Sequence, residues 1–196
     1  MARYSTHDVR GRLLDAGVTT FSKSGFHGSS VQDITDAAGV PKGSFYNHFE
    51  SKEALGVAAL DHYWSDDAGD RLKILGQPGT APLTRLRQYF EQIIVDLAAK
   101  NYTCGCLAAN MTAEVSDHSA AIATQLSAIF ASWSSQIADC LGEAQAAGEI
   151  RPAVDIGILA TFVLNAWEGA VLRARIEKGE RPLRQFIDVL FTQLLR

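Results

Sequence analysis

The sequence has few residues of the kinds that build disulfide frameworks or metal centres. Its 196 residues include three cysteines, an odd number, and no Cys or His spacing resembles a zinc or iron–sulfur site. No glycine-rich phosphate-binding loop follows a strand-like segment. We therefore expect no metal, no cofactor and thiols that stay reduced.

Export and membrane signals are also missing. The first residues lack the positive-then-apolar pattern of a signal peptide, and no uninterrupted apolar run reaches the roughly 18 residues of a membrane span. The net charge is −4, and residues 1–55 hold six basic and six acidic side chains. We expect a cytoplasmic protein without membrane contact, in which any attraction to nucleic acid is local and salt-sensitive.

Residues 30–55 carry the signals of two short helices joined by a tight turn. Ser30 and Asp33 form a capping box at the start of the first helix. Gly39 can adopt the left-handed conformation that the turn needs, and Val40 can fill the angle between the helices. Pro41 suits the opening of the second helix. This is the pattern of a helix-turn-helix, which indicates DNA binding.

The residues of the second helix sort by face. Phe45 and Phe49 are one turn apart and can bury together, which leaves a row of small and polar side chains outside. Such side chains can reach base edges or donate to phosphate oxygens, whereas an ordinary solvated helix has little use for an exposed tyrosine. The predicted DNA-binding residues are Ser30, Lys42, Gly43, Ser44, Tyr46, Asn47, His48 and Lys52.

The same residues resemble the signature of TetR/AcrR-type transcriptional regulators. The matching positions include Gly25-Phe26, Ala37-Ala38-Gly39-Val40, residues 42–49 and Ser51-Lys52-Glu53-Ala54-Leu55. The resemblance implies an all-helical homodimer. It also implies binding to a palindromic operator and release when a small effector occupies the C-terminal part.

The rest of the chain also reads as helical. We predict an all-α protein of about nine helices, with a three-helix DNA-binding head at 1–50 and a helical effector-binding and dimerisation body at 51–196. The body helices are expected near residues 51–75, 82–99, 105–115, 119–147, 153–178 and 183–195, with a loop at 76–79.

The last two predicted helices are apolar on more than one face. A helix of this kind is buried on several sides, either inside its own domain or against a second subunit. We predict a four-helix interface between two copies. Its residues are Phe162, Ala166, Ala170, Phe186, Leu190 and Phe191.

Residues 103–117 form a second region with chemical content. If a helix begins at Gly105, Cys106 lies in its first turn, where the helix dipole stabilises a thiolate. Asn110 and Glu114 would share its face, and a nearby Glu114 would oppose thiolate formation. The segment resembles the subgroup of these regulators that senses electrophiles and oxidants through a cysteine, which here matches Cys106. The alternative is that Cys106 is a small buried hydrophobe.

An effector that binds without covalent chemistry is expected in a mostly apolar pocket. The predicted effector residues are Cys106, Asn110, Tyr63, Tyr89, Trp133 and Trp167, and the alternative for each aromatic ring is ordinary core packing. Two other classes of protein remain open. One is an enzyme that uses Cys106 as nucleophile and His118 as base; the other is an architectural DNA-binding protein that ignores small molecules.

Overall fold

The computed structural model describes residues 9–195, and within that range the secondary structure is helical without strands. The chain forms two compact units. The first joins the N-terminal part of the chain through residue 67 with residues 106–129. The second joins residues 68–105 with residues 130–196. The predicted all-α class is confirmed.

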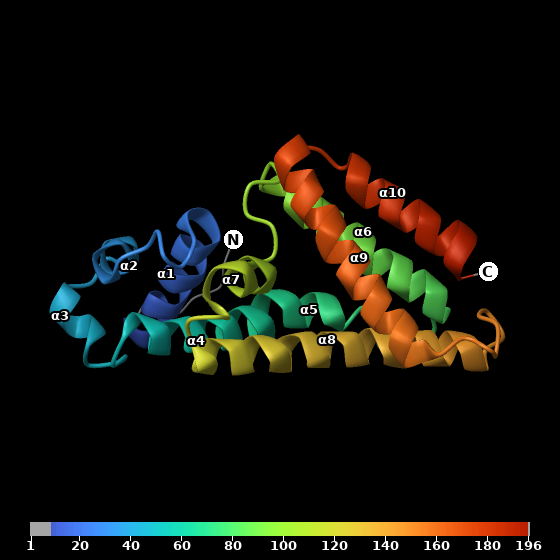
Figure 1. Cartoon of the computed structure of the whole chain (residues 1–196), viewed down its shortest axis with the longest axis horizontal. Coiled ribbons are helices and arrows are strands. Elements are labelled where there is room, and N and C mark those ends of the chain that lie inside the picture. Colours follow the sequence, from blue (N-terminus) through green and yellow to red (C-terminus); the bar gives the residue numbers. More distant parts are fainter. Residues whose placement is uncertain (1–8, 196) are drawn as a thin grey trace. The chain divides into compact units, whose positions relative to one another are not determined.

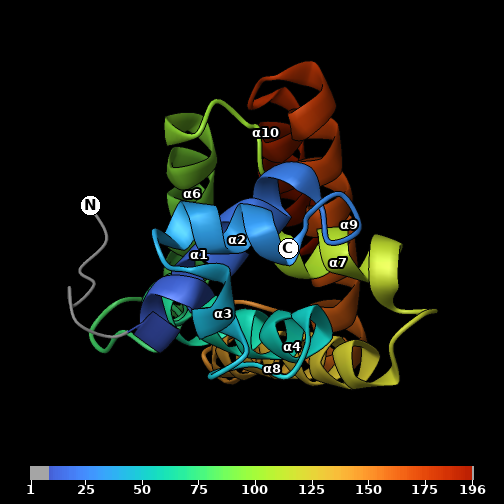
Figure 2. The ribbon, with the colours of Figure 1, turned by 90° about the vertical axis from the view of Figure 1, so that its left-hand side faces the viewer.

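The first unit contains α1 (Val9–Ser24), α2 (Val31–Ala38), α3 (Lys42–Phe45), α4 (Lys52–His62) and α7 (Leu107–Val115), with the first part of α8 (Ala120–Ala146). A π-helical segment, η1 (Tyr63–Ala68), follows α4 directly. α1 packs against α2, α4 and α7, and α2 contacts α3 (Figures 1 and 2). The core of this unit includes Leu13, Phe21, Ile34, Phe45 and Leu55, all fully buried or nearly so.

The turn between α2 and α3 has the predicted geometry. Ser30 caps α2 in a reciprocal capping box, since its hydroxyl accepts from the Asp33 amide while the Asp33 carboxylate accepts from the Ser30 amide. Gly39 lies in the left-handed region at φ 63°, and Val40 is buried behind it. The Val40 amide donates to the Thr35 carbonyl at 3.0 Å, which closes the end of α2.

The second unit contains α5 (Gly69–Leu72), α6 (Pro82–Ala99), the remainder of α8, α9 (Ile156–Glu177), α10 (Arg181–Val189) and a second π-helical segment, η2 (Leu190–Leu194). Its centre is an aromatic cluster. The ring centroids of Phe90 and Trp167 are 4.7 Å apart, and the Phe186 ring lies 5.0 Å and 5.2 Å from them. Edge-to-face and tilted pairs of this kind add to the gain from burial alone.

Two predicted helices differ in detail from the structure. The helix expected over 51–75 changes to π geometry at Tyr63 and ends at Leu72. The last helix begins at Arg181, two residues early, because Pro182 fits its first turn. If η1 and α5 are counted with α4, and η2 with α10, residues 9–195 form nine helical rods, as predicted.

The Gly39→Ala substitution tests the turn. A Cβ at this residue would lie 2.9 Å from Arg12 Nη2 and would force a side chain into the left-handed region. We expect a loss of about 1–2 kcal/mol of unfolding free energy from the backbone strain, measured by urea denaturation. Gly79→Ala carries a similar strain, at a φ of 79°, but no atom lies within 4 Å of its Cβ, so any larger loss in Gly39→Ala reports the contact with Arg12. Wild-type stability of Gly39→Ala would contradict this account.

Candidate functional site

The first candidate site is the outer surface of α3 and the turn after it. Phe45 and Phe49 point inward, with ring centroids 5.8 Å apart, and both are buried. α3 ends at Phe45, so Tyr46, Asn47 and His48 lie in the turn that follows it. The sequence had suggested that these three residues are part of the helix. The His48 and Phe49 amides both donate to the Phe45 carbonyl, so the backbone after α3 makes one further helical turn.

The hydrogen-bond donors on this surface are open to solvent. Lys42, Asn47 and His48 are exposed, the Tyr46 side chain is 57% exposed, and Ser44 is half-buried. No atom lies within 4 Å of a Cβ built on Gly43, so another backbone can approach here closely. Amide, ammonium and hydroxyl groups at these places can bond base edges and phosphate oxygens.

Ser30 has a structural role in addition to the predicted one. Its exposed hydroxyl donates to the Asp33 carboxylate at 2.6 Å. The bonds from the Ser30 side chain and backbone hold the pKa of Asp33 below its ordinary value. The hydroxyl lies at the N-terminus of α2, where amide groups attract an anion such as a phosphate.

Lys52 also has a structural role. Its ammonium donates to the carbonyl oxygens of Phe26 and Ser29, both at 2.8 Å, and lies 4.4 Å from the Phe26 ring centroid. Burial lowers the pKa of Lys52, and the nearby Glu114 opposes that shift. These bonds tie the start of α4 to the loop between α1 and α2. One of the three ammonium protons is left for a phosphate.

Sequence reasoning missed Arg12. Its guanidinium donates to the carbonyl oxygens of Ala38 and Gly39, so it fastens α1 to the turn that positions α3. The partners are 26 and 27 residues away in the chain. No local pattern signals a bond across such a separation.

The second candidate site surrounds Cys106, which is the N-cap of α7. The sequence had predicted it in the first turn of that helix. The reason for the difference is Gly105, whose φ of 67° is left-handed and delays the start of the helix. Cys106 is 7% exposed, and the Tyr63 hydroxyl lies 4.0 Å from its Sγ. Asn110 lies one turn further along α7 and is half-buried. Cys106 therefore lies at the N-terminus of α7, and its side chain makes no capping hydrogen bond to the first turn of that helix.

Glu114 does not stand beside this thiol. Eight residues of helix separate it from Cys106, which corresponds to about 12 Å along the axis, beyond the Debye length at physiological salt. Its carboxylate instead accepts from the His27 amide at 3.2 Å, where it links α7 to the loop after α1. The expected repulsion of a thiolate is therefore weak.

The other two thiols have different surroundings. Cys104 is half-buried in the loop before α7. Cys140 is buried in the second unit, and burial raises the pKa of its thiol to about 11. A thiol with that pKa stays protonated at neutral pH and reacts slowly.

The predicted effector residues are divided between the two units. Tyr63, Cys106 and Asn110 belong to the first unit, whereas Tyr89, Trp133 and Trp167 belong to the second. Tyr89 and Trp167 are buried against Phe90, as core residues are. Their assignment to an effector site stays a prediction.

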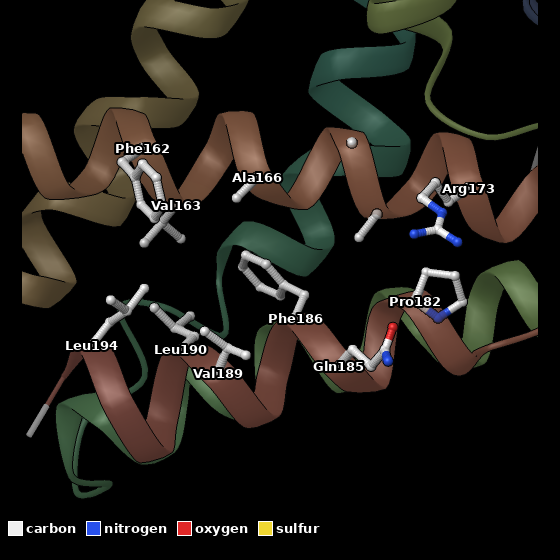
Figure 3. Close-up of a pocket in the computed structure, with 12 residues that line it drawn as sticks. Phe162, Val163, Ala166, Arg173, Pro182, Gln185, Phe186, Val189, Leu190 and Leu194 are labelled. Atoms are coloured by element: carbon white, nitrogen blue, oxygen red, sulfur yellow. The ribbon is translucent and has the colours of Figure 1, made fainter.

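The third candidate site is an apolar groove of about 300 Å³ between α9 and α10. Figure 3 shows Phe162, Val163 and Ala166 on α9 facing Phe186 on α10 and Leu190 at the start of η2. Ala170 also lines the groove, whereas Phe191 packs under the Arg87 guanidinium at 4.3 Å. The outer face of α9 is apolar as well. Ile158 is 72% exposed, Phe162 53%, Leu172 50% and Ile176 82%.

α9 is also long and apolar enough to cross a membrane, by length and composition alone. A helix that is buried in a soluble core or at a subunit contact passes the same test. Asn165, Arg173 and Arg175 interrupt the apolar surface of the helix.

Comparison with known sequences gives matches over both parts of the chain. Residues 13–59 match the family described as bacterial regulatory proteins, tetR family. Residues 82–190 match the family described as tetracyclin repressor-like, C-terminal domain.

Individual relatives agree with these matches. The chain is 42% identical to the HTH-type transcriptional repressor DhaR of Mycobacterium sp. (strain GP1) over 187 residues, which covers 95% of this chain and 92% of DhaR. It resembles the crystal structure of the regulatory protein TetR from Rhodobacter sphaeroides with a TM-score of 0.86 at 31% identity, over 91% of this chain and 94% of that one.

A third relative is the repressor NemR of Escherichia coli. The identity is 36% over 118 residues, which covers 60% of this chain and 59% of NemR. The crystal structure of reduced NemR matches with a TM-score of 0.81 at 26% identity, over 92% of this chain and 94% of that one. This similarity supports the resemblance to the cysteine-containing subgroup. The chain belongs to the TetR family and is a DNA-binding transcriptional regulator.

Proposed function

We propose that this regulator is a homodimeric repressor that binds a palindromic operator through α3 and leaves it when Cys106 is modified or a small apolar effector binds. The exposed donor surface of α3, fixed in place by Arg12 and by the two buried phenylalanines, carries the DNA-binding part of the proposal. In this assignment Lys42 and Asn47 reach base edges, while Ser44, Tyr46 and His48 donate to phosphates. Ser30 and Lys52 add phosphate contacts at the ends of α2 and α4.

Replacing Tyr46 tests the DNA-binding surface. Tyr46→Ala removes an exposed ring and hydroxyl without opening the core. We expect binding to a duplex selected from a random pool by the wild-type protein to weaken by about 10- to 100-fold, the loss of one good contact. Fluorescence anisotropy measures the affinity, with Tyr102→Ala, in the loop before α7, as control. Unchanged affinity of Tyr46→Ala would remove α3 from the interface.

The apolar face of α9 and the groove beside it support the dimer. The exposed residues Ile158, Phe162, Leu172 and Ile176 are separated by 4, 10 and 4 residues, which places all of them on one face of α9, as in a helix paired with another helix. Small residues at Ala166, Gly169 and Ala170 let a second helix approach closely at mid-length. A second copy of the chain fits this self-complementary surface, because an isologous contact presents the same patch twice.

A charge on this face should separate the subunits. Phe162→Glu would bury a carboxylate among apolar side chains, which costs far more than leaving it in water. We expect the variant to sediment as a monomer at concentrations where the wild-type protein is a dimer. Val95→Glu is the matched control, since Val95 is 58% exposed on α6, outside the groove. A Phe162→Glu protein that remains dimeric would exclude this interface.

The thiol of Cys106 supports the sensing part of the proposal. It lies at a helix N-terminus, and the chain resembles the repressor NemR, whose crystal structure is described as that of a reduced form. An electrophile with an activated double bond reacts with the thiolate directly. The sulfur bonds one alkene carbon, and the carbon next to the carbonyl takes a proton from water.

N-ethylmaleimide tests this thiol. We expect it to release the wild-type protein from the selected duplex and to leave the Cys106→Ser variant bound. Cys104→Ser should respond as the wild type does. Cys140 should label slowly at neutral pH because its thiol, with a pKa of about 11, carries little thiolate there. Release of Cys106→Ser at the wild-type rate would refute sensing by this residue.

We propose no catalytic role for Cys106. The base considered for it, His118, lies beyond the opposite end of α7, and nine helical residues span about 13 Å. A nucleophile and its base need hydrogen-bonding distance, so this pair does not fit an enzyme mechanism.

A further inference from the structure

One side chain beside the proposed sensing thiol belongs to a segment with unusual geometry. Tyr63, whose hydroxyl lies 4.0 Å from Cys106 Sγ, is the first residue of the π-helical segment η1. The thiol is buried and protein interiors are close-packed. Any group that becomes bonded to the sulfur must therefore compete with the Tyr63 side chain for space.

The π-helical geometry of η1 has an α-helical alternative that needs only a shift of its hydrogen bonds. A π-helix closes its bonds over five residues in place of four, is rare, and occurs frequently at functional sites. If the same residues return to α-helical geometry, side chains after the changed turn rotate by about 100°, the angle of one residue in a 3.6-residue turn. Transmission between two places in a protein requires a two-state element of this kind.

His62 connects η1 to the DNA-binding head. It is the last residue of α4, its Nε2 lies 2.7 Å from Asp15 Oδ1 on α1, and its Nδ1 lies 3.3 Å from Asp66 Oδ2 in η1. The imidazole ring therefore touches α1 on one side and the π-helical turn on the other. The His62 and Asp15 side chains are both less than a quarter exposed.

α1 in turn holds the DNA-reading element. Arg12 is three residues before Asp15 on the same helix, so the two side chains are neighbours on its surface. The Arg12 guanidinium bonds the carbonyls of Ala38 and Gly39, directly before α3. A displacement that starts at Tyr63 can thus reach the entry of α3 through His62, Asp15 and Arg12, all within the first compact unit.

We propose that Tyr63 and His62 are the positioning residues that carry modification of Cys106 to α3, by conversion of η1 between π- and α-helical geometry. The inference rests on the proposed function, since it takes Cys106 as the modified residue. A maleimide adduct on the sulfur displaces the Tyr63 ring and η1 changes register, so that Asp66, which follows the changed turn, rotates away from His62. The imidazole ring, no longer held on that side, then leaves Asp15. α1 then no longer holds Arg12 against the turn before α3.

The test compares operator affinity before and after complete labelling of Cys106 with N-ethylmaleimide. Mass spectrometry confirms that this residue is labelled. In the wild-type protein we expect the affinity to fall about 5- to 150-fold, the range typical of coupling between sites. Tyr63→Ala gives the adduct room, so its affinity should change by about twofold or less upon equal labelling. A residue with only a structural role would alter basal affinity or stability and leave this ratio unchanged.

Two further variants complete the test. Tyr102→Ala removes a tyrosine from the loop before α7 and should keep the wild-type ratio. Asp15→Ala removes the carboxylate that His62 contacts on α1 and should lower the ratio of affinities before and after labelling, as Tyr63→Ala does. If Tyr63→Ala does not fold, Asp15→Ala tests the route by itself. A wild-type protein that labels without losing affinity would refute the proposed function itself. A responsive wild type with wild-type ratios in both Tyr63→Ala and Asp15→Ala would overturn only the route through η1.

Discussion

The position of α3 is the constraint on which the proposed contact with DNA depends. α3 has four residues, and a helix of one turn has no stability of its own, so its place is imposed by contacts. Phe45 and Phe49 anchor it from below, Gly39 permits the sharp entry, and Arg12 holds the carbonyls at that entry. These contacts fix the outward side chains of α3 and leave them exposed to solvent. Arg12 makes the position of α3 depend on α1, and the proposed route from Cys106 acts on this dependence.

α9 shows how the second unit combines a core with an outer contact surface. One face of the helix buries Val163 and Trp167 in the aromatic core, and another leaves Phe162 and Ile176 uncovered. An apolar face of this extent supports the proposed contact with a second copy of the same helix. Two copies related by a twofold axis would offer two α3 helices to one duplex, which matches the symmetry of a palindrome.

Features with local causes were predictable from the sequence, and features with distant causes were not. The capping box of Ser30 and Asp33 and the left-handed Gly39 follow from neighbouring residues, and both predictions are confirmed. The bonds of Arg12, Lys52 and His62 join residues between 23 and 47 positions apart, which no periodicity reveals. The π-helical turn at Tyr63 was missed because a π-helix and an α-helix share the same apolar pattern over so short a stretch.

The site around Cys106 shows the same division. The thiol was expected near a helix start and is found there, but one left-handed residue, Gly105, moved it to the N-cap. Its contact with Tyr63, 43 residues away, had no signal in the sequence. Which side chains touch DNA or effector stays a prediction, because those contacts involve molecules outside the chain.

The sequence that the protein itself selects from a random duplex pool, together with the number of protomers bound to that duplex, tests the central claim most directly. Two α3 helices on a twofold axis predict an inverted repeat with half-sites about 34–36 Å apart, or a multiple of that spacing, bound by an even number of protomers. Selection of an asymmetric site that one protomer occupies, or no enrichment of any sequence at low salt, would contradict the account.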